Sequence, residues 1–185
     1  MKTNNLKSLE EIYNRHSAPL NCGDGDKGTS HSYISHYYGK KFERLKNKKL
    51  KILEIGVARG LSLEMWGEYF SHSEIYGVEI EHIHYRPSNN RIKLIIGDAT
   101  RSETFDQIPN LDIIIDDGSH RLMDQVFSYM ILFDKLNKGG LYIIEDIKRI
   151  DSTASTFKKL NNNARVYDFR RIKNRIDDVI VEIIK

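Results

Sequence analysis

The sequence predicts an α/β fold whose core is a doubly wound, mostly parallel sheet, because apolar runs typical of buried strands alternate with helical patterns along the chain. The clearest runs, residues 111–115 and 141–144, are rich in β-branched residues, and each leads directly into acidic residues. Parallel strands need a crossover between them, which the intervening helices provide. Two final apolar segments predict an antiparallel hairpin at the edge. We therefore expect seven strands with helices on both faces of the sheet.

The expected elements run from a helical lead-in, residues 1–48, to a core, residues 49–185. We treat both as a single domain, because 185 residues suit one hydrophobic core. In the lead-in, Ser8 is suited to cap a short helix over residues 9–13, turn residues fill positions 21–29, and a second helix is expected over residues 33–47. The expected strands of the core cover residues 51–55, 74–79, 91–97, 111–116, 141–145, 165–169 and 178–184, and the expected helical segments cover residues 61–70, 105–108, 121–136 and 155–162.

The composition is that of an ordinary globular protein, with 39% hydrophobic and 30% charged residues. A net charge of +3 is too small to argue for nucleic acid or a membrane surface as a partner. Cys22 is the single cysteine, which excludes a disulfide framework and favours a reducing cytoplasm. No apolar run approaches the roughly 20 residues that span a bilayer, and the N-terminus lacks the hydrophobic core of a signal peptide. We expect a cytoplasmic protein with no membrane span and no nucleic-acid partner.

A glycine-containing turn follows the first expected strand. Its sequence, Glu54-Ile55-Gly56-Val57-Ala58-Arg59-Gly60, precedes a helix whose N-terminus favours polar ligand groups. Gly56 and Gly60 allow a tight turn and a close approach of the backbone to a ligand. Many turns of this kind contain glycine for steric reasons alone, so the glycines by themselves do not establish a ligand-binding site.

Further strands also end in acidic residues at the same edge of the predicted sheet. Glu79 ends the second strand, about 20 residues beyond Gly60, where a carboxylate accepts hydrogen bonds from ribose hydroxyls. Asp98, beside Ala99, follows the third strand, and Asp116 ends the fourth. Strand ends are commonly polar, but this many acids in register favour a nucleoside-type ligand.

The identity of the nucleoside follows from Glu54. The spacing Glu-x-Gly-x-x-x-Gly differs from the dinucleotide fingerprint Gly-x-Gly-x-x-Gly, and a carboxylate here would crowd a pyrophosphate. S-adenosylmethionine carries an ammonium, a sulfonium, a ribose and an adenine but no phosphate, so it suits these acids better. A nicotinamide-dependent oxidoreductase is the alternative on a similar sheet.

Segments spread over residues 24–150 form a specific motif set: 26–33 (DKGTSHSY), 53–57 (LEIGV), 62–66 (SLEMW), 75–78 (IYGV), 113–120 (IIIDDGSH) and 139–146 (GGLYIIED). This set resembles the metal-dependent sugar O-methyltransferases of macrolide biosynthesis, the macrocin type, and the related cephalosporin hydroxylase-like proteins. The resemblance implies a Rossmann-like class I methyltransferase fold, bound S-adenosylmethionine, Mg²⁺ and methyl transfer to a sugar hydroxyl. The macrolide enzymes carry an extra N-terminal domain for which this sequence has no room, so the acceptor is not implied.

The resemblance also implies roles for individual residues. Asp116 faces the cofactor while Asp117, on the opposite face of the strand, binds the metal. Glu145 and Asp146 complete a set of oxygen ligands that suits Mg²⁺. The expected cofactor-binding residues are Glu54, Gly56, Gly60, Ser62, Glu79, Asp98, Ala99 and Asp116.

His120 is the candidate general base, because an imidazole titrates near the working pH. Helix capping or packing is the alternative role for His120, and a satisfied loop turn is the alternative for Glu145 and Asp146. Lys27-Gly28-Thr29 is not a phosphate loop, because that motif needs Gly-Lys-Ser/Thr after a strand.

The sequence thus predicts a Mg²⁺-assisted O-methyltransferase acting on a sugar hydroxyl, in a natural-product glycoside or a surface polysaccharide. The expected partner is a small-molecule or glycan substrate with a free hydroxyl, and homo-oligomerisation is left open. A non-catalytic carbohydrate-binding protein on the same fold is the alternative from a different functional class.

Overall fold

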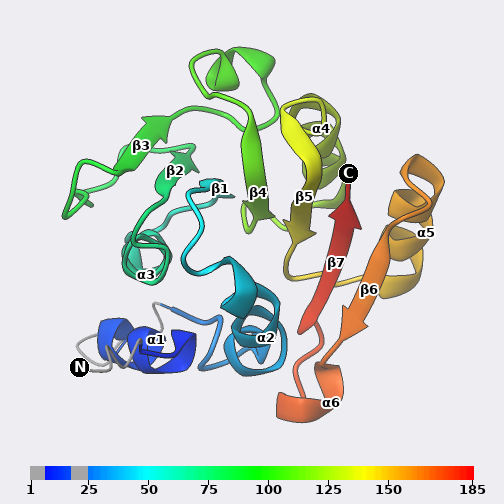
Figure 1. Ribbon diagram of the computed structural model, residues 1–185. Helices are drawn as coiled ribbons and strands as arrows, with labels where there is room; N and C mark the ends of the chain where they lie inside the picture. Colours follow the sequence, from blue (N-terminus) through cyan, green and yellow to red (C-terminus); the bar gives the residue numbers. More distant parts are fainter. Residues whose placement is uncertain (1–6, 18–24) are drawn as a thin grey trace.

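The computed structural model describes residues 7–17 and 25–185, and a mixed β-sheet lies at its centre (Figure 1). Its strand order is β3-β2-β1-β4-β5-β7-β6. Strands β1 to β5 pair in parallel, whereas β7 is antiparallel to both of its neighbours. The strands are β1 (Lys51–Ile55), β2 (Glu74–Glu79), β3 (Ile92–Ile96), β4 (Leu111–Asp116), β5 (Leu136–Ile144), β6 (Arg165–Asp168) and β7 (Val179–Ile184). The predicted sheet and its C-terminal hairpin are confirmed, whereas Cys22 and the turn residues 21–24 lie outside the described residues.

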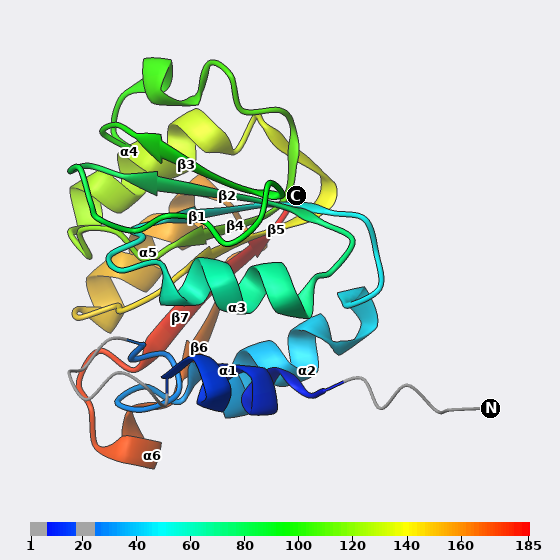
Figure 2. The same ribbon diagram turned by 90° about the vertical axis from the view of Figure 1, so that its left-hand side faces the viewer.

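Helices cover both faces of this sheet (Figures 1 and 2), with α1, α2 and α3 on one face and α4 and α5 on the other. Alternate strand residues point to opposite sides, so Ile52 and Ile113 belong to one apolar cluster, and Leu53 and Ile114 to the other. Burial on both faces explains why these strands are continuous apolar runs. The helices are α1 (Leu9–Ser17), η1 (Ile34–Tyr38), α2 (Gly39–Phe42), η2 (Glu43–Leu45), α3 (Leu61–Tyr69), η3 (Ser102–Phe105), α4 (Leu122–Leu132), α5 (Ile150–Leu160) and α6 (Arg170–Lys173).

Several expected boundaries differ from the structure. The helix expected over residues 121–136 ends at Leu132, because β5 begins at Leu136, where it pairs with Leu111. The helix expected over residues 155–162 begins earlier, at Ile150, and the expected segment 105–108 is a 3₁₀ turn over Ser102–Phe105. The helix expected over residues 33–47 is divided into η1, a π-helical turn, followed by α2 and η2. A π-helical turn of this kind frequently lies at a functional site.

Polar contacts within the lead-in fix its own conformation. The Oγ of Ser8 accepts a hydrogen bond from the N–H of Glu11 at 3.1 Å, and the Glu11 carboxylate accepts one from the N–H of Ser8 at 2.6 Å. This reciprocal capping box confirms the predicted start of α1. From that helix, the hydroxyl of Tyr13 donates to the carbonyl of Gly25 and accepts the N–H of Thr29, which holds the loop before η1 against α1.

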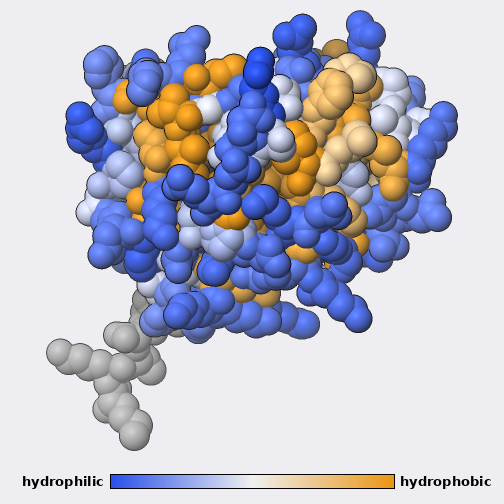
Figure 3. Space-filling view, turned by 90° about the horizontal axis from the view of Figure 1, so that it is seen from above, coloured by the Kyte–Doolittle hydropathy of each residue, from blue (hydrophilic) through white to orange (hydrophobic). Residues whose placement is uncertain are grey.

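The face seen from above is mostly hydrophilic, with apolar side chains gathered in separate patches (Figure 3). Large exposed apolar residues include Ile80, Ile96, Met123, Phe127 and Met130. Within residues 7–17 and 25–185, no helix has both the length and the apolar character required to cross a membrane.

Candidate active site

A cavity of about 470 Å³ opens at the carboxyl ends of β1, β2 and β4, where an open α/β sheet binds its ligands. Its lining includes many of the predicted site residues: Gly56, Ser62, Glu79, Asp98, Ala99, Asp116, Asp117 and His120. Ile55, Val57 and Val78 add apolar walls. The cavity therefore combines acidic groups with apolar surface, as a nucleoside site requires.

The glycine turn after β1 lines this cavity through residues 56–59, whereas Gly60 is not among the lining residues. Gly56 has φ +85°, and a Cβ at this position would lie 2.2 Å from the carbonyl oxygen of Asp117. Gly60 has φ +82°, and a Cβ there would meet the ring of Tyr85. Both positions therefore require glycine, for conformation and for space.

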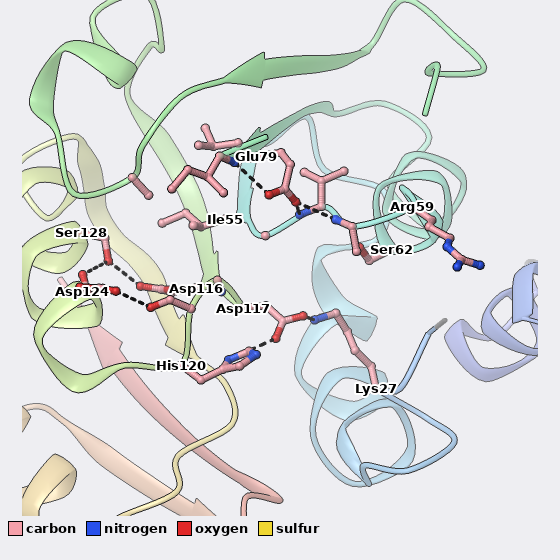
Figure 4. Close-up of a pocket in the computed structure, with 18 of the residues that line it drawn as sticks. Lys27, Ile55, Arg59, Ser62, Glu79, Asp116, Asp117, His120, Asp124 and Ser128 are labelled. Carbon is pink, nitrogen blue, oxygen red and sulfur yellow. Dashed lines mark hydrogen bonds and ion pairs between the residues drawn. The ribbon is translucent and has the colours of Figure 1, made fainter. Parts of the chain in front are cut away.

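Glu79 is bound to the turn itself (Figure 4). Its Oε2 accepts the N–H groups of Val57 and Ala58, each at 2.9 Å, and its Oε1 accepts the N–H of Ile80. The carboxylate thus stays at the end of β2, beside the cavity, where a ribose was predicted. Its assignment to the cofactor stays a prediction.

Asp116 and Asp117 serve different partners, as the alternation of strand side chains predicts (Figure 4). Asp116 turns towards α4, where its Oδ2 accepts the hydroxyl of Ser128 at 2.6 Å. Burial raises the pKa of Asp116, although the Ser128 hydroxyl opposes this shift. Asp117 turns the other way, towards Lys27 and His120.

His120 lies between two acidic side chains at the edge of the cavity. Its Nδ1 is 4.0 Å from Oδ1 of Asp117, and its Nε2 is 3.8 Å from Oδ2 of Asp146. Ligand atoms of Asp117, His120 and Asp146 all lie within 4.8 Å of one another, a spacing that can hold a metal ion. The imidazole lines the cavity, which excludes an orientation away from it.

Asp146 is held by two aromatic residues of the lead-in. The hydroxyl of Tyr33 donates to Oδ1 of Asp146 at 2.9 Å and accepts the N–H of Asp146 at 3.2 Å. His31 is fully buried, stacks on the Tyr33 ring and brings its Nε2 to 3.3 Å from the same Oδ1. Burial raises the pKa of Asp146, and the neighbouring Asp117 raises it further. His31 and Tyr33 therefore both contact a predicted site residue.

Glu145 points to a different place from Asp146. One of its oxygens accepts the hydroxyl of Tyr38, and the other lies 2.7 Å from Nζ of Lys27. Glu145 is buried and is not among the residues whose ligand atoms meet at His120. Its assignment as a metal ligand stays a prediction, with Lys27 lying between it and Asp117.

Lys27 is the site residue that sequence reasoning missed. Its side chain is buried, and its Nζ lies 2.5 Å from Oδ2 of Asp117, 2.7 Å from Oε2 of Glu145 and 3.2 Å from Oε1 of Glu54. Burial alone would lower the pKa of Lys27, but these carboxylates raise it well above its usual value. A lysine in a turn-rich stretch is usually solvated, so the sequence pattern gives no sign of this burial.

Glu54 consequently contacts a cation of the protein itself. Its carboxylate is fully buried beneath the glycine turn and is not part of the cavity lining, and burial raises its pKa. In this structure Glu54 contacts Lys27, and its assignment to the ammonium of a bound cofactor stays a prediction.

Comparisons with known proteins give this site a context. No family model matches the chain. The chain is 35% identical over 136 residues to 8-demethyl-8-alpha-L-rhamnosyl tetracenomycin-C 2′-O-methyltransferase of Streptomyces olivaceus, covering 66% of this chain and 35% of that protein. It is 32% identical over 150 residues to demethylmacrocin O-methyltransferase of Streptomyces fradiae, covering 75% of this chain and 36% of that protein.

A solved structure extends the similarity to nearly the whole chain. The MycE methyltransferase of the mycinamycin biosynthetic pathway, in complex with Mg, SAH and mycinamycin VI, has a TM-score of 0.74 and 26% identity, covering 97% of this chain and 55% of that one. The chain thus spans about a third of the length of its curated relatives and about half of MycE. The sheet is that of class I methyltransferases, and the chain is a homologue of the sugar O-methyltransferases of macrolide and tetracenomycin pathways, of the macrocin O-methyltransferase type.

Proposed function

We propose that this chain is an S-adenosylmethionine-dependent, Mg²⁺-assisted O-methyltransferase that transfers a methyl group to a sugar hydroxyl. The observation that carries the proposal is the position of His120, between Asp117 and Asp146 at the edge of the cavity. A base and two carboxylates beside a nucleoside-sized cavity are what methyl transfer to a hydroxyl requires. The homologues, which are sugar O-methyltransferases by name, support the same reaction.

The cavity fits S-adenosylmethionine in size and in lining. About 470 Å³ lies within the range of small-molecule sites. We assign the adenosine to the side of the cavity formed by Glu79, Asp98 and Ala99, and the methionine part to the glycine turn. SAH is bound in MycE, which supports this assignment for its homologue.

The Asp117, His120 and Asp146 group fits Mg²⁺ through its chemistry. Carboxylate oxygens are the ligands that Mg²⁺ prefers, and two carboxylates leave room for water and substrate oxygens. We propose Asp117, which follows β4, and Asp146 and Glu145, which follow β5, as ligands. When bound, the ion would stabilise the negative charge that develops on the acceptor oxygen.

In this mechanism His120 accepts the proton of the acceptor hydroxyl. Nδ1 of His120 is buried without a hydrogen-bond partner among residues 7–17 and 25–185, so we assign the proton transfer to Nε2. The carboxylates of Asp117 and Asp146 then stabilise the imidazolium from its two sides. The cavity walls hold the methyl donor in line with the acceptor oxygen, so catalysis consists of positioning and charge stabilisation.

We propose a glycoside as the acceptor, in a natural product or a surface polysaccharide, because the relatives are named for rhamnosyl and macrocin acceptors. We further propose that residues 1–185 act as one methyltransferase unit in the cytoplasm. The single cysteine suits that reducing compartment.

The cofactor assignment can be tested without knowing the acceptor. SAH should raise the melting temperature of the protein, and NAD should not, because a ligand that binds only the native state stabilises it. Stabilisation by NAD alone would instead favour the oxidoreductase alternative.

The reaction itself is tested with a panel of rhamnosides and macrolide glycosides, S-adenosylmethionine and Mg²⁺. We expect SAH formation that stops on addition of EDTA and resumes with excess Mg²⁺. SAH formation that is insensitive to EDTA would contradict the role of the metal. Carbohydrate binding without any turnover would favour the non-catalytic alternative.

A further inference from the structure

Lys27 contacts acidic side chains from three different strand ends. Glu54 belongs to β1, Asp117 follows β4 and Glu145 follows β5, and the Lys27 side chain is only 4% exposed. An ammonium group has three N–H donors, and here it has three carboxylate neighbours. No role predicted from the sequence accounts for this arrangement.

We propose that Lys27 is a positioning residue that orients the carboxylate of Asp117 at the proposed metal site and holds Glu145 beside it. The inference rests on the proposed function, and it adds a residue of the lead-in to the machinery of the reaction. In this role Lys27, which lines the cavity, acts through the carboxylates.

The two oxygens of Asp117 show how this orientation works. Oδ2 of Asp117 lies 2.5 Å from Nζ of Lys27, while Oδ1 faces Nδ1 of His120 (Figure 4). Because Lys27 fixes the first oxygen, the second is directed towards the group formed with Asp146. Outer contacts of this kind commonly set the orientation of ligating carboxylates.

The charges around Lys27 support the same role. Asp117 and Glu145 each lie within hydrogen-bond distance of Nζ, so their carboxylates are close to each other, with the ammonium between them. A neutral side chain at position 27 would leave these carboxylates facing each other without a cation. Mutual repulsion would then turn them away from their present orientation.

The loop that carries Lys27 is itself fixed. The Lys27 carbonyl accepts the N–H of Ile34 at 3.1 Å, which anchors the loop to η1. At Gly28, a Cβ would lie 2.4 Å from the ring of Tyr13, so the loop packs directly on α1. The lead-in therefore presents Lys27 to the strand ends from a defined position.

Lys27→Met tests the proposal, because methionine fills similar space without charge. Electron paramagnetic resonance distinguishes free Mn²⁺ from bound Mn²⁺. A titration of the protein with Mn²⁺ therefore measures metal affinity in the absence of cofactor and acceptor. We expect Lys27→Met to weaken Mn²⁺ binding by about ten- to hundredfold, as loss of an outer-shell contact typically does. Lys27→Arg, which keeps the charge, should recover part of that affinity.

Lys41→Met is the matched control. Nζ of Lys41 lies 2.5 Å from the fully buried Glu182, on β7, so this variant also removes a lysine from a buried carboxylate. We expect both variants to lose stability, but only Lys27→Met to bind Mn²⁺ more weakly. That result would show that Lys27 positions the metal ligands in addition to stabilising the fold.

Glu54→Gln gives a second test if Lys27→Met does not fold. It removes one anchor of Nζ without altering Asp117 or Glu145, so we expect a smaller, severalfold loss of Mn²⁺ affinity. Wild-type or tighter Mn²⁺ binding in folded Lys27→Met would overturn this inference and leave the proposed function standing. If Lys27→Met does not fold, the same result in Glu54→Gln would do so. A wild-type protein that binds neither Mn²⁺ nor SAH would overturn the proposed function as well, so the two failures are distinguishable.

Discussion

His120 and Asp146 face each other across the site, with Nε2 and Oδ2 at 3.8 Å, and both residues have the left-handed backbone conformation, φ +57°. Residues other than glycine rarely adopt this conformation, and it tends to occur at functional sites. Each residue follows a strand end, so the two strained turns bring an imidazole and a carboxylate together. The pairing lies outside the periodic structure, where sequence patterns carry little information.

Replacing His120 by alanine should lower kcat by about two to four orders of magnitude, the usual contribution of a general base. The affinity for SAH should stay close to wild type, because the imidazole lies beside the proposed metal site and not among the residues assigned to the cofactor. Kinetics with a glycoside acceptor and calorimetry with SAH measure the two effects. His82→Ala, at an exposed loop position, is the control and should keep full activity. Undiminished kcat in His120→Ala would remove the proposed base.

Tyr33→Phe should weaken Mg²⁺ binding by about tenfold, because Asp146 loses the hydroxyl that orients its Oδ1. The buried N–H of Asp146 also loses its acceptor, which should lower stability by about 1–3 kcal/mol. The Mg²⁺ dependence of methyl transfer and urea denaturation report these effects.

Tyr37→Phe is the control for Tyr33→Phe. The Tyr37 hydroxyl donates to the buried Glu182 at 2.5 Å, away from the Asp117, His120 and Asp146 group. Its loss should reduce stability without changing the Mg²⁺ dependence. Equal Mg²⁺ effects in both variants would argue against a specific role for Tyr33.

Gly56→Ala should be strongly destabilising. The added Cβ would lie 2.2 Å from the carbonyl oxygen of Asp117, at a backbone φ of +85°. Displacement of this segment should also reduce SAH affinity.

Gly139→Ala is the control that separates backbone strain from steric overlap. Gly139 also has a positive φ, +77°, but no heavy atom lies within 4 Å of the added Cβ. We expect it to lose only about 1–2 kcal/mol, the cost of the left-handed conformation, with SAH affinity retained. Urea denaturation measures the free energy of unfolding of both variants. Equal losses of this free energy in Gly56→Ala and Gly139→Ala would contradict the steric argument.

Asp116→Asn should raise the melting temperature at neutral pH. Burial raises the folded-state pKa of Asp116 above the ordinary value of 3.8, so the folded protein binds the proton more tightly than the unfolded chain does. The stability that protonation contributes is present below pH 3.8 and is lost as the pH rises through the folded-state pKa. The advantage of asparagine should therefore be full above that pKa and disappear in acid. Melting curves of wild type and Asp116→Asn at neutral pH and below pH 3.8 measure the difference in melting temperature. A higher melting temperature of Asp116→Asn in acid alone would contradict the predicted pH dependence.

The sequence predicts the central strands accurately and the irregular parts poorly, for physical reasons. The expected ranges 51–55, 74–79 and 111–116 coincide with β1, β2 and β4, because strands buried on both faces must be apolar throughout. The start of β5 was missed, since the residues Asn137 to Gly140 have the composition of a turn and yet continue the strand.

In the candidate site, too, the positions at strand ends are predictable from the sequence and the long-range contacts are not. Positions at strand ends follow from topology, so the cavity brings Gly56, Asp117 and His120 together as predicted. The role of Lys27 depends on acids that are 27 to 118 positions away along the chain, and no local pattern reports such contacts. The orientation of Glu145 towards Tyr38 is likewise decided by packing of the lead-in.

A crystal structure with Mn²⁺ and SAH, in which anomalous scattering locates the ion, tests the proposed metal site most directly. We expect one strong anomalous peak within about 2.0–2.6 Å of carboxylate oxygens of Asp117 and Asp146. His120 should face the same space, with the sulfur of SAH directed towards it. An anomalous peak elsewhere, or none while SAH is bound, would contradict the metal site on which the proposed reaction depends.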